Sequence, residues 1–395
     1  MSNCSTVVGL VKCQNYAPEA VSAAISQAID FLGGIEKFVK PGQKVLIKPN
    51  ILNSSPPAKG ITTHPEIIRA LIRLVLRAGG IPYVGDSPGL GSARKGAEGC
   101  GILKVVWEEG AHFIDFHHAA HIGEINFSSG RVLKQVQFVK AVLEMDVVIN
   151  AAKLKTHGFT GITAAVKNLF GCLPGLLKSQ CHVRFARKED FDLMLLDILQ
   201  LVKPALNIVD AVVAMEGEGG PVTGALRPMN IIVAGVDAVA VDSVCAVLTG
   251  KQPHDFGFLK AAAQNGIGET NLDNIKIVGE PLVENIHKDF KQINRARETM
   301  LPNWVPNFIR TFLRRDFVDR PRLIKNKCKR CGACQKVCAA GAITLVDGRP
   351  TFDYAKCISC FCCQEMCKYS ALKIRKSFLA RVSFALGRLL SKLYV

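Results

Sequence analysis

Eight cysteines near the C-terminal end constrain this chain most, because their spacing suits few kinds of site. They form two runs of C-x₂-C-x₂-C-x₃-C. Three thiolates of such a run can face one iron–sulfur cube while the fourth reaches across to the other cube. The spacing therefore predicts two [4Fe–4S] clusters. The ligands expected for one cluster are Cys328, Cys331, Cys334 and Cys367. The ligands expected for the other are Cys357, Cys360, Cys363 and Cys338.

The double run resembles a bacterial two-cluster ferredoxin module, although Ala339 and Lys368 stand where that family usually has proline. This departure removes no ligand. Structural zinc and disulfides are the alternatives. Zinc sites lack the third closely spaced cysteine, and disulfides do not need a duplicated spacing. The resemblance implies electron transfer.

The size and composition of the chain are those of a globular protein with two or three domains. It has 395 residues, of which 49% are hydrophobic. No apolar run approaches the roughly twenty residues of a spanning helix, and the N-terminus has no pattern of an export signal. Seven of the 15 cysteines are not among these eight and are scattered. We therefore expect a reducing cytoplasm.

The positive charge is concentrated at the C-terminal end. From residue 301 onward there are 19 Lys and Arg against 5 Asp and Glu, so this part carries +14 of the formal +17. A basic surface favours an acidic redox partner protein or the anionic inner face of a membrane. Nucleic acid is not expected as a partner, because the chain has neither a recognition motif nor basic residues interleaved with aromatic ones.

Residues 1–300 alternate β-rich runs with helical patterns, which predicts an α/β body with a largely parallel sheet and crossover helices. The expected strands are Thr6–Val11, Val45–Lys48, Pro82–Gly85, Val147–Asn150, Leu206–Asp210, Asn230–Ala234 and Ile275–Val278. The expected helices are Glu19–Leu32, Thr63–Ala78, Phe191–Val202 and Ala238–Leu248. Residues 113–139 alternate like an antiparallel hairpin insertion. Thr63 is the expected helix cap.

Three shorter segments follow the body. We expect a linker over residues 301–322, then a small ferredoxin-like α+β domain with the clusters over residues 323–376. Residues 377–395 have the pattern of a basic amphipathic helix. Such a helix can pack on its own protein, lie in the plane of a membrane surface or bind a partner protein.

Polar residues gather after four of the expected strands. In an open parallel sheet, ligands bind beyond the carboxyl ends of the strands, so these clusters are expected to converge. The first two clusters contain Lys48, Asn50, His64, Asp86 and Ser87. The third contains Asn150, Lys153, Lys155, Thr156, His157, Lys167 and Asn168. The fourth contains Asp210, Glu216, Glu218 and Gly219.

Residue types suggest roles within this site. The lysines suit an anionic small molecule. The acidic residues could hold a divalent cation, position a hydroxyl or amine, or pair with the lysines. His64 and His157 could transfer protons, or could simply make loop hydrogen bonds. His182 is a weaker candidate. The histidines of the insertion could bind a metal or be solvated: His112, His117, His118 and His121. No familiar phosphate-binding loop is present.

The phrases K-P-N, T-T-H-P, G-D-S-P-G and E-G-E-G-G-P resemble the domain-of-unknown-function family numbered 362. The most specific phrase is the long N-A-A-K-L-K-T-H-G-F-T-G-I-T-A-A-V-K-N-L-F-G. The resemblance runs from about residue 5 to 285, and implies an iron–sulfur protein with an α/β body but no settled reaction. The positions matching the motifs are Lys48, Asn50, His64, Asp86, Lys153, Lys155, His157, Lys167, Asn168, Glu216 and Gly219.

The leading hypothesis is a cytoplasmic iron–sulfur oxidoreductase. Its clusters would pass electrons to an anionic ligand in the body, with Lys155, His157 and His64 as the catalytic residues. One alternative is a non-catalytic electron carrier or assembly component that docks a redox partner at the membrane. Another is a transferase dependent on a metal or a nucleotide, with structural clusters. The sequence names no substrate and no organic cofactor.

Overall fold

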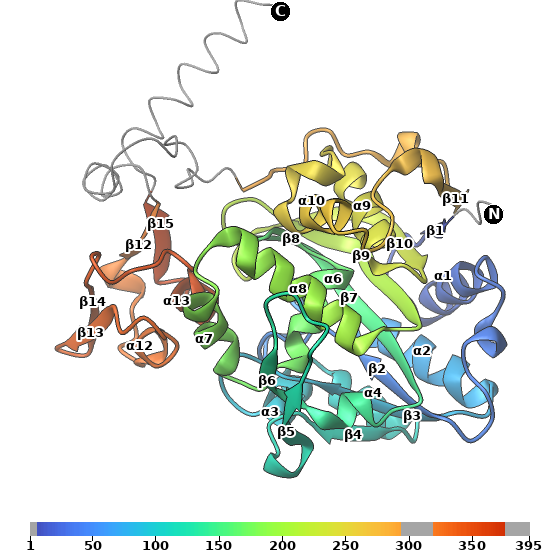
Figure 1. Cartoon of the computed structure of the whole chain (residues 1–395), viewed down its shortest axis with the longest axis horizontal. Helices are drawn as coiled ribbons and strands as arrows, with labels where there is room; N and C mark the ends of the chain where they lie inside the picture. The colour runs from blue at the N-terminus through green and yellow to red at the C-terminus, as the bar shows by residue number, and fades with distance from the viewer. Residues whose placement is uncertain (1–5, 294–318, 376–395) are drawn as a thin grey trace, which may run out of the picture. The chain divides into compact units, whose positions relative to one another are not determined.

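The computed structural model of the chain describes residues 6–293 and 319–375. The chain divides into two compact units, Met1–Lys291 and Gln292–Val395, each of which is considered by itself. The first unit is an α/β body, and the second carries the cysteine runs (Figure 1). The expected helix over residues 377–395 and most of the expected linker lie outside the described residues.

The body is built on one large sheet. Its strand order is β11-β1-β10-β9-β7-β2-β3-β4, with β8 paired to β7. The N-terminal strands are β1 (Thr6–Lys12), β2 (Lys44–Lys48), β3 (Ile81–Asp86) and β4 (His112–Asp115). The later strands are β7 (Val147–His157), β8 (Gly161–Thr163), β9 (Leu206–Glu216), β10 (Ala225–Gly235) and β11 (Ile275–Gly279). In the main path, β10 is antiparallel to both neighbours and all other neighbouring strands are parallel. The predicted, largely parallel sheet is confirmed.

Three strands are much longer than the sequence predicted. Strands β7, β9 and β10 each have 11 residues. The expected strands ended at the first polar residues, yet every residue of β7 is buried, including Lys153 and Lys155. These lysines fit inside a strand because their amino groups find hydrogen-bond acceptors within the body.

Helices cover both faces of the sheet and enclose two hydrophobic cores. Side chains of β7 alternate between them: Ile149 and Ala151 face one core, and Ala152 and Leu154 face the other. The longer helices are α1 (Pro18–Asp30), α2 (Pro65–Arg77), α8 (Lys188–Val202) and α9 (Ala238–Leu248). The shorter ones are α3 (Ala93–Gly99), α4 (Ile102–Glu108), α5 (Lys140–Leu143), α6 (Ala165–Asn168), α7 (Leu177–Arg184) and α10 (Gly257–Gln264). None of the helices described is long and apolar enough to cross a membrane.

Two local expectations change. Helix α2 is capped by His64, whose Nδ1 accepts from Glu66 N at 3.3 Å, and Thr63 is not the cap. The Thr63 hydroxyl instead donates to the carbonyl of Ala151 and accepts from Asn50 N. In the insertion, β4 joins the edge of the large sheet, whereas β5 (Ile122–Asn126) and β6 (Gln135–Val139) form the antiparallel pair.

The second unit is an internal repeat with an offset of 29 residues. The first half contains β12 (Arg320–Leu323), α12 (Ala333–Lys336) and β13 (Ile343–Val346). The second contains β14 (Arg349–Phe352), α13 (Cys362–Glu365) and β15 (Leu372–Arg375). Every element of the second half begins 29 positions after its counterpart, as do the four cysteines of its run.

The two halves of this repeat exchange strands. Strand β12 pairs antiparallel with β15, and β13 pairs with β14. The first strand of one half therefore lies beside the last strand of the other. Because β12 begins at Arg320, the unit includes the last residues of the segment that the sequence predicted as a linker.

Candidate functional site

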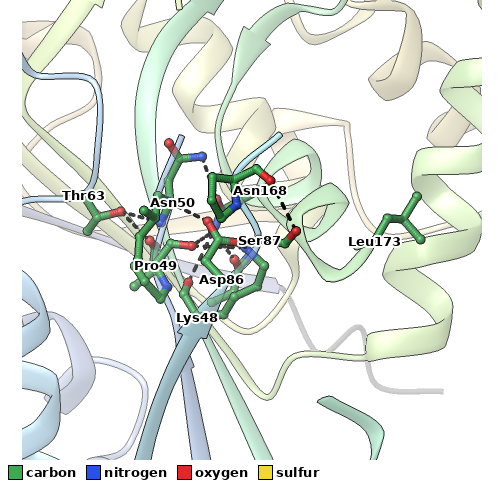
Figure 2. A network of polar contacts seen from close by, with 12 residues as sticks. Lys48, Pro49, Asn50, Thr63, Asp86, Ser87, Asn168 and Leu173 are labelled. Carbon is green, nitrogen blue, oxygen red and sulfur yellow. Dashed lines mark hydrogen bonds and ion pairs between the residues drawn. The ribbon is translucent and has the colours of Figure 1, made fainter. Parts of the chain in front are cut away.

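The ends of β2 and β3 place a buried ion pair at the centre of the polar site. Lys48 Nζ lies 2.7 Å from Asp86 Oδ1, and the two side chains are 0% and 4% exposed. The other carboxylate oxygen, Asp86 Oδ2, accepts from Ile51 N at 2.6 Å. Figure 2 shows the surrounding polar side chains gathered around Asp86. Both charges are therefore balanced inside the protein, so Lys48 is not a free anion-binding group.

A chain of amides extends from this pair through the body. Asn50 donates to Asn168 at 3.0 Å, and Asn168 donates to Asn150 at 2.8 Å. Asn150 in turn donates to Asn207 at 2.9 Å. At the Asn50 end of this chain, Lys155 Nζ donates hydrogen bonds to Asn50 Oδ1 at 2.7 Å and to the carbonyl of Ile61 at 2.6 Å. These contacts hold the Asn50 side chain, which is partly exposed, in one orientation.

A second buried ion pair forms between β7 and β9. Lys153 Nζ lies 2.9 Å from Asp210 Oδ2 and 2.8 Å from the hydroxyl of Tyr16. Tyr16 donates to Asp210 Oδ1 at 2.8 Å. Burial lowers the pKa of Lys153, whereas Asp210 acts in the opposite direction. Burial and then Asp210 raise the pKa of Tyr16, which therefore stays protonated.

His64 covers this group from the outside. Its ring stacks on Tyr16 with centroids 3.7 Å apart and an interplanar angle of 8°. Its backbone N donates to Asp210 Oδ2 at 3.0 Å. Tyr16 and His64 are both partly exposed, whereas Lys153 and Asp210 are buried behind them. A ligand approaching from solvent would therefore meet the two rings first.

The hydrogen bonds of both candidate histidines define their tautomers. Nδ1 of His64 accepts from Glu66 N, and Nδ1 of His157 accepts from Phe159 N at 3.0 Å and Thr160 N at 3.3 Å. Each neutral ring therefore carries its proton on Nε2. Burial lowers the pKa of His64 to about 4, so this ring is neutral near pH 7. It is suited to donate a hydrogen bond to a ligand rather than to take up a proton.

Glycines allow close approach around the site. A Cβ on Gly171 would meet Asp86 Oδ1 and, at 2.7 Å, Lys48 Nζ. A Cβ on Gly220 would meet Thr156, whose hydroxyl donates to the carbonyl of Gly217 at 2.9 Å. Gly219 packs equally tightly on Thr223. The glycine-rich stretch thus packs against the end of β7.

The fourth polar cluster does not join a cation site. Glu216 accepts from Lys291 N at 3.0 Å, while Asp86 and Asp210 are paired with lysines. Of the three roles left open for the acidic residues, pairing with lysines is the one that the structure shows for Asp86 and Asp210. Over residues 6–293 and 319–375, no group of three His, Cys, Asp or Glu residues could hold a single metal ion.

A third polar group brings the predicted candidates Ser87 and His117 together with Lys178, which the sequence did not indicate. Ser87 Oγ lies 2.8 Å from His117 Nε2 and accepts from Lys178 Nζ at 2.9 Å and Gly175 N at 2.8 Å. Burial lowers the pKa of Lys178 to about 7. Ser87 is only 3% exposed, and the group joins the loop after β3 to α7 and to the residues just before it. His117 is half-buried here, unlike the exposed His118.

Two further candidates make contacts with aromatic rings. Lys167 Nζ lies 4.2 Å from the centre of the Phe170 ring. His182 is buried against Phe191, with ring centroids 4.5 Å apart, and its Nδ1 has no hydrogen-bond partner. Burial lowers the pKa of His182 to about 3. This histidine is a neutral ring in an aromatic core.

In the second unit, a cavity is lined by four cysteines taken from both runs. They are Cys328, Cys331, Cys334 and Cys367. Cysteines of one run also lie close enough to cysteines of the other run to affect their pKa values. Burial and then nearby cysteines, Cys338 of the first run among them, raise the pKa of Cys357 and Cys363. The cavity takes three cysteines from one run and the last from the other.

Comparison with known proteins places the body in a family. The model of the "Domain of unknown function (DUF362)" family matches residues 45–247, about half of the chain. A "Thylakoid-associated protein" of Synechocystis sp. is 34% identical over 270 residues, which cover 67% of this chain and 80% of that protein. The chain belongs to the DUF362 family. The matched segment includes Lys48, Asp86, Lys153 and Asp210.

Two solved structures share a remote likeness with this DUF362 protein. One is the lactate racemase apoprotein from Thermoanaerobacterium thermosaccharolyticum, with 11% identity and a TM-score of 0.38. The match covers 59% of this chain and 54% of the racemase. The other is a protein from Thermotoga maritima, with 15% identity, a TM-score of 0.35, and coverage of 64% and 59%.

Proposed function

We propose that the chain is an iron–sulfur redox protein with two [4Fe–4S] clusters in its second unit. The observation that carries the proposal is the cavity lined by Cys328, Cys331, Cys334 and Cys367, the set expected for one cluster. The crossed strand pairing of the repeat supports a matching set of Cys357, Cys360, Cys363 and Cys338. A four-iron cluster spaces its thiolates more widely than a single ion would, because iron and sulfide lie between them. The ligands thus fit a ferredoxin-like module.

When bound, such clusters supply single electrons. We propose that these electrons reach an anionic small molecule at the partly exposed edge formed by Tyr16, His64 and Asn50. His64 would donate a hydrogen bond from Nε2, and Asn50 is oriented by Lys155. The ion pairs of Lys48 and Lys153 lie behind this edge and fix its geometry. The hydroxyl of Tyr16, in contact with both Lys153 and Asp210, keeps its proton and would help to position the ligand.

The test uses full-length protein with both clusters, reduced anaerobically with dithionite. The reduced protein is mixed with a panel of small carboxylates and phosphates, and reoxidation of the clusters is followed by absorbance. At least one compound should accelerate reoxidation. Tyr16→Phe and His64→Asn, which keeps a capping side chain, should slow that reaction at least about tenfold.

The controls use another stacked pair of the same residue types. Tyr83 and His112 stack 4.8 Å apart on β3 and β4, so Tyr83→Phe and His112→Asn should leave the rate unchanged. The enzyme proposal fails if no compound binds and reoxidation is equally slow with all of them.

A second candidate function is a non-catalytic electron carrier at a membrane surface. It is favoured by the relative, which is named a thylakoid-associated protein, and by the charge of +14 from residue 301 onward. Flotation with vesicles containing anionic lipid would test it. Salt-sensitive binding, together with no ligand-dependent reoxidation, would favour this candidate over the enzyme.

A further inference from the structure

The two halves of the second unit share a backbone but differ in charge. Residues 320–346 contain seven Lys and Arg and no Asp or Glu, a net +7. Residues 349–375 contain five against two, a net +3. The exposed basic residues of the first half form a collar around its cysteine loop: Lys325, Lys327, Lys329, Arg330 and Lys336. The residues at the equivalent positions of the second half are Tyr354, Lys356, Ile358, Ser359 and Glu365.

The backbone does not explain this difference. Arg330 and Ser359 occupy equivalent positions in the two cysteine loops, and their φ angles are 56° and 54°. Both loops therefore make the same left-handed turn, which a serine adopts in one half and an arginine in the other. The turn does not demand a large cation at residue 330. The basic side chains of the first loop need another reason.

The first loop also brings its thiols closer to solvent. Cys331 is exposed, whereas its counterpart Cys360 is only partly exposed; Cys334 is partly exposed, whereas Cys363 is buried. The fourth ligands differ in the opposite sense, since Cys367 is buried and Cys338 is partly exposed. In the first loop, Lys329 and Arg330 line the same cavity as its three cysteines. Positive charge and accessible thiols thus meet at one cluster position.

No acidic group on the described surface neutralises these two side chains. Among the ion pairs of residues 6–293 and 319–375, none involves Lys329 or Arg330. A partner that complements the collar must therefore bring its own negative charge.

We propose that the cluster position of Cys328, Cys331, Cys334 and Cys367 exchanges electrons with a separate, acidic redox protein that docks on the collar. This inference rests on the proposed iron–sulfur function. The step moves one electron between the partner's redox centre and that cluster, so one centre is oxidised as the other is reduced and no bond is broken. The second cluster position has Ile358 and Ser359 in place of Lys329 and Arg330 and so lacks the charge for such docking.

The repeat offers a matched pair of variants. Lys329→Ile/Arg330→Ser gives the first loop the residues of the second, and Ile358→Lys/Ser359→Arg makes the reverse change. The probe is an acidic plant-type [2Fe–2S] ferredoxin, reduced and mixed with oxidised full-length protein at several salt concentrations. For wild type, the second-order rate should fall steeply as salt rises. At low salt, Lys329→Ile/Arg330→Ser should be at least about tenfold slower, with a weaker salt dependence. The reverse variant should match or exceed wild type.

Separate readouts distinguish the two proposals. Iron content and photoreduction by a neutral deazaflavin should be the same for wild type and both variants. Absent clusters in wild type would overturn the proposed function itself. With clusters intact, equal ferredoxin rates for wild type and Lys329→Ile/Arg330→Ser would overturn the proposal that an acidic redox protein docks on the collar. Loss of binding to anionic vesicles with an unchanged ferredoxin rate would also overturn it, and would assign the collar to a membrane.

Discussion

The polar edge of the body and the cysteine loops of the second unit handle charge in different ways. In the body, Lys48 and Asp86 lie 2.7 Å apart, and Lys153 and Asp210 lie 2.9 Å apart, all buried. In the second unit, thiols from two runs meet at a cavity beside Lys329 and Arg330. The body therefore pairs its buried lysines with carboxylates, whereas Lys329 and Arg330 form no ion pair with any of the described residues.

This difference indicates what each region needs from outside the chain. Burial and then neighbouring cysteines, Cys360 foremost, raise the pKa of Cys363 well above its usual value. Burial of this kind disfavours free thiolates, and the proposed clusters would supply the positive charge that keeps the sulfurs deprotonated. The body site needs no such addition to be stable. It presents a neutral His64 and an oriented Asn50 at its partly exposed edge, so a ligand can bind without rebuilding the buried charges.

The largest effect is expected from breaking a buried ion pair of the body. Lys153→Met leaves Asp210 charged and buried, so the free energy of unfolding should fall by about 3–5 kcal/mol. Urea unfolding followed by circular dichroism measures this change. The control is Lys356→Met in the second unit, whose ion pair with Asp353 is solvent-exposed and should contribute less than about 1 kcal/mol.

A double variant sharpens this test. Lys153→Met/Asp210→Leu removes both charges and should recover part of the lost stability. If Lys153→Met costs no more than Lys356→Met, the body site does not depend on internal charge pairing, and the contrast between the two regions fails.

A smaller loss is expected from adding one methyl group beside the other ion pair. Gly171→Ala places a Cβ against Asp86 Oδ1 and Lys48 Nζ, and should cost about 1–3 kcal/mol. Gly9→Ala in β1 is the matched control, because its Cβ would make only an ordinary contact, 3.4 Å from the carbonyl oxygen of Ala28. Thermal unfolding of both variants gives the comparison. Equal melting temperatures would show that the Lys48–Asp86 pair is loosely packed.

A pH-dependent effect on stability is expected from the aromatic core. The pKa of His182 is lowered by burial from 6.5 to about 3, so the unfolded chain binds its proton more readily than the folded protein does. Stability should therefore fall as pH drops from 6.5 toward 3, by up to about 1.4 kcal/mol per pH unit from this group. His182→Phe should remove that part of the slope. His118→Gln, at an exposed position, should not change it.

Much of the body could be predicted from its sequence, since β-rich runs marked the seven expected strands and polar phrases marked their ends. Tyr16 was missed, although it also follows a strand, β1, and the same rule would have found it. Lys178 and the contact between His117 and Ser87 could not have been found this way, because these residues meet only through folding of distant segments. Lys153 was assigned to a loop because a buried lysine in a strand is acceptable only once Asp210 is known to face it.

The central claim is that the two cysteine runs bind two clusters crosswise. The direct test is iron content and electron paramagnetic resonance of the dithionite-reduced full-length protein in four variants: Cys331→Ala, Cys367→Ala, Cys338→Ala and Cys360→Ala. Cys362→Ala, at a cysteine outside both ligand sets, is the control. Wild type and this control should hold about eight iron atoms and show two interacting clusters.

Crosswise binding predicts which spectra agree. Cys331→Ala and Cys367→Ala should leave the same single cluster signal, and Cys338→Ala and Cys360→Ala should leave the other. The same remaining signal in Cys331→Ala and Cys338→Ala would contradict crosswise binding. A colourless wild-type protein that holds zinc instead of iron would contradict the presence of the clusters.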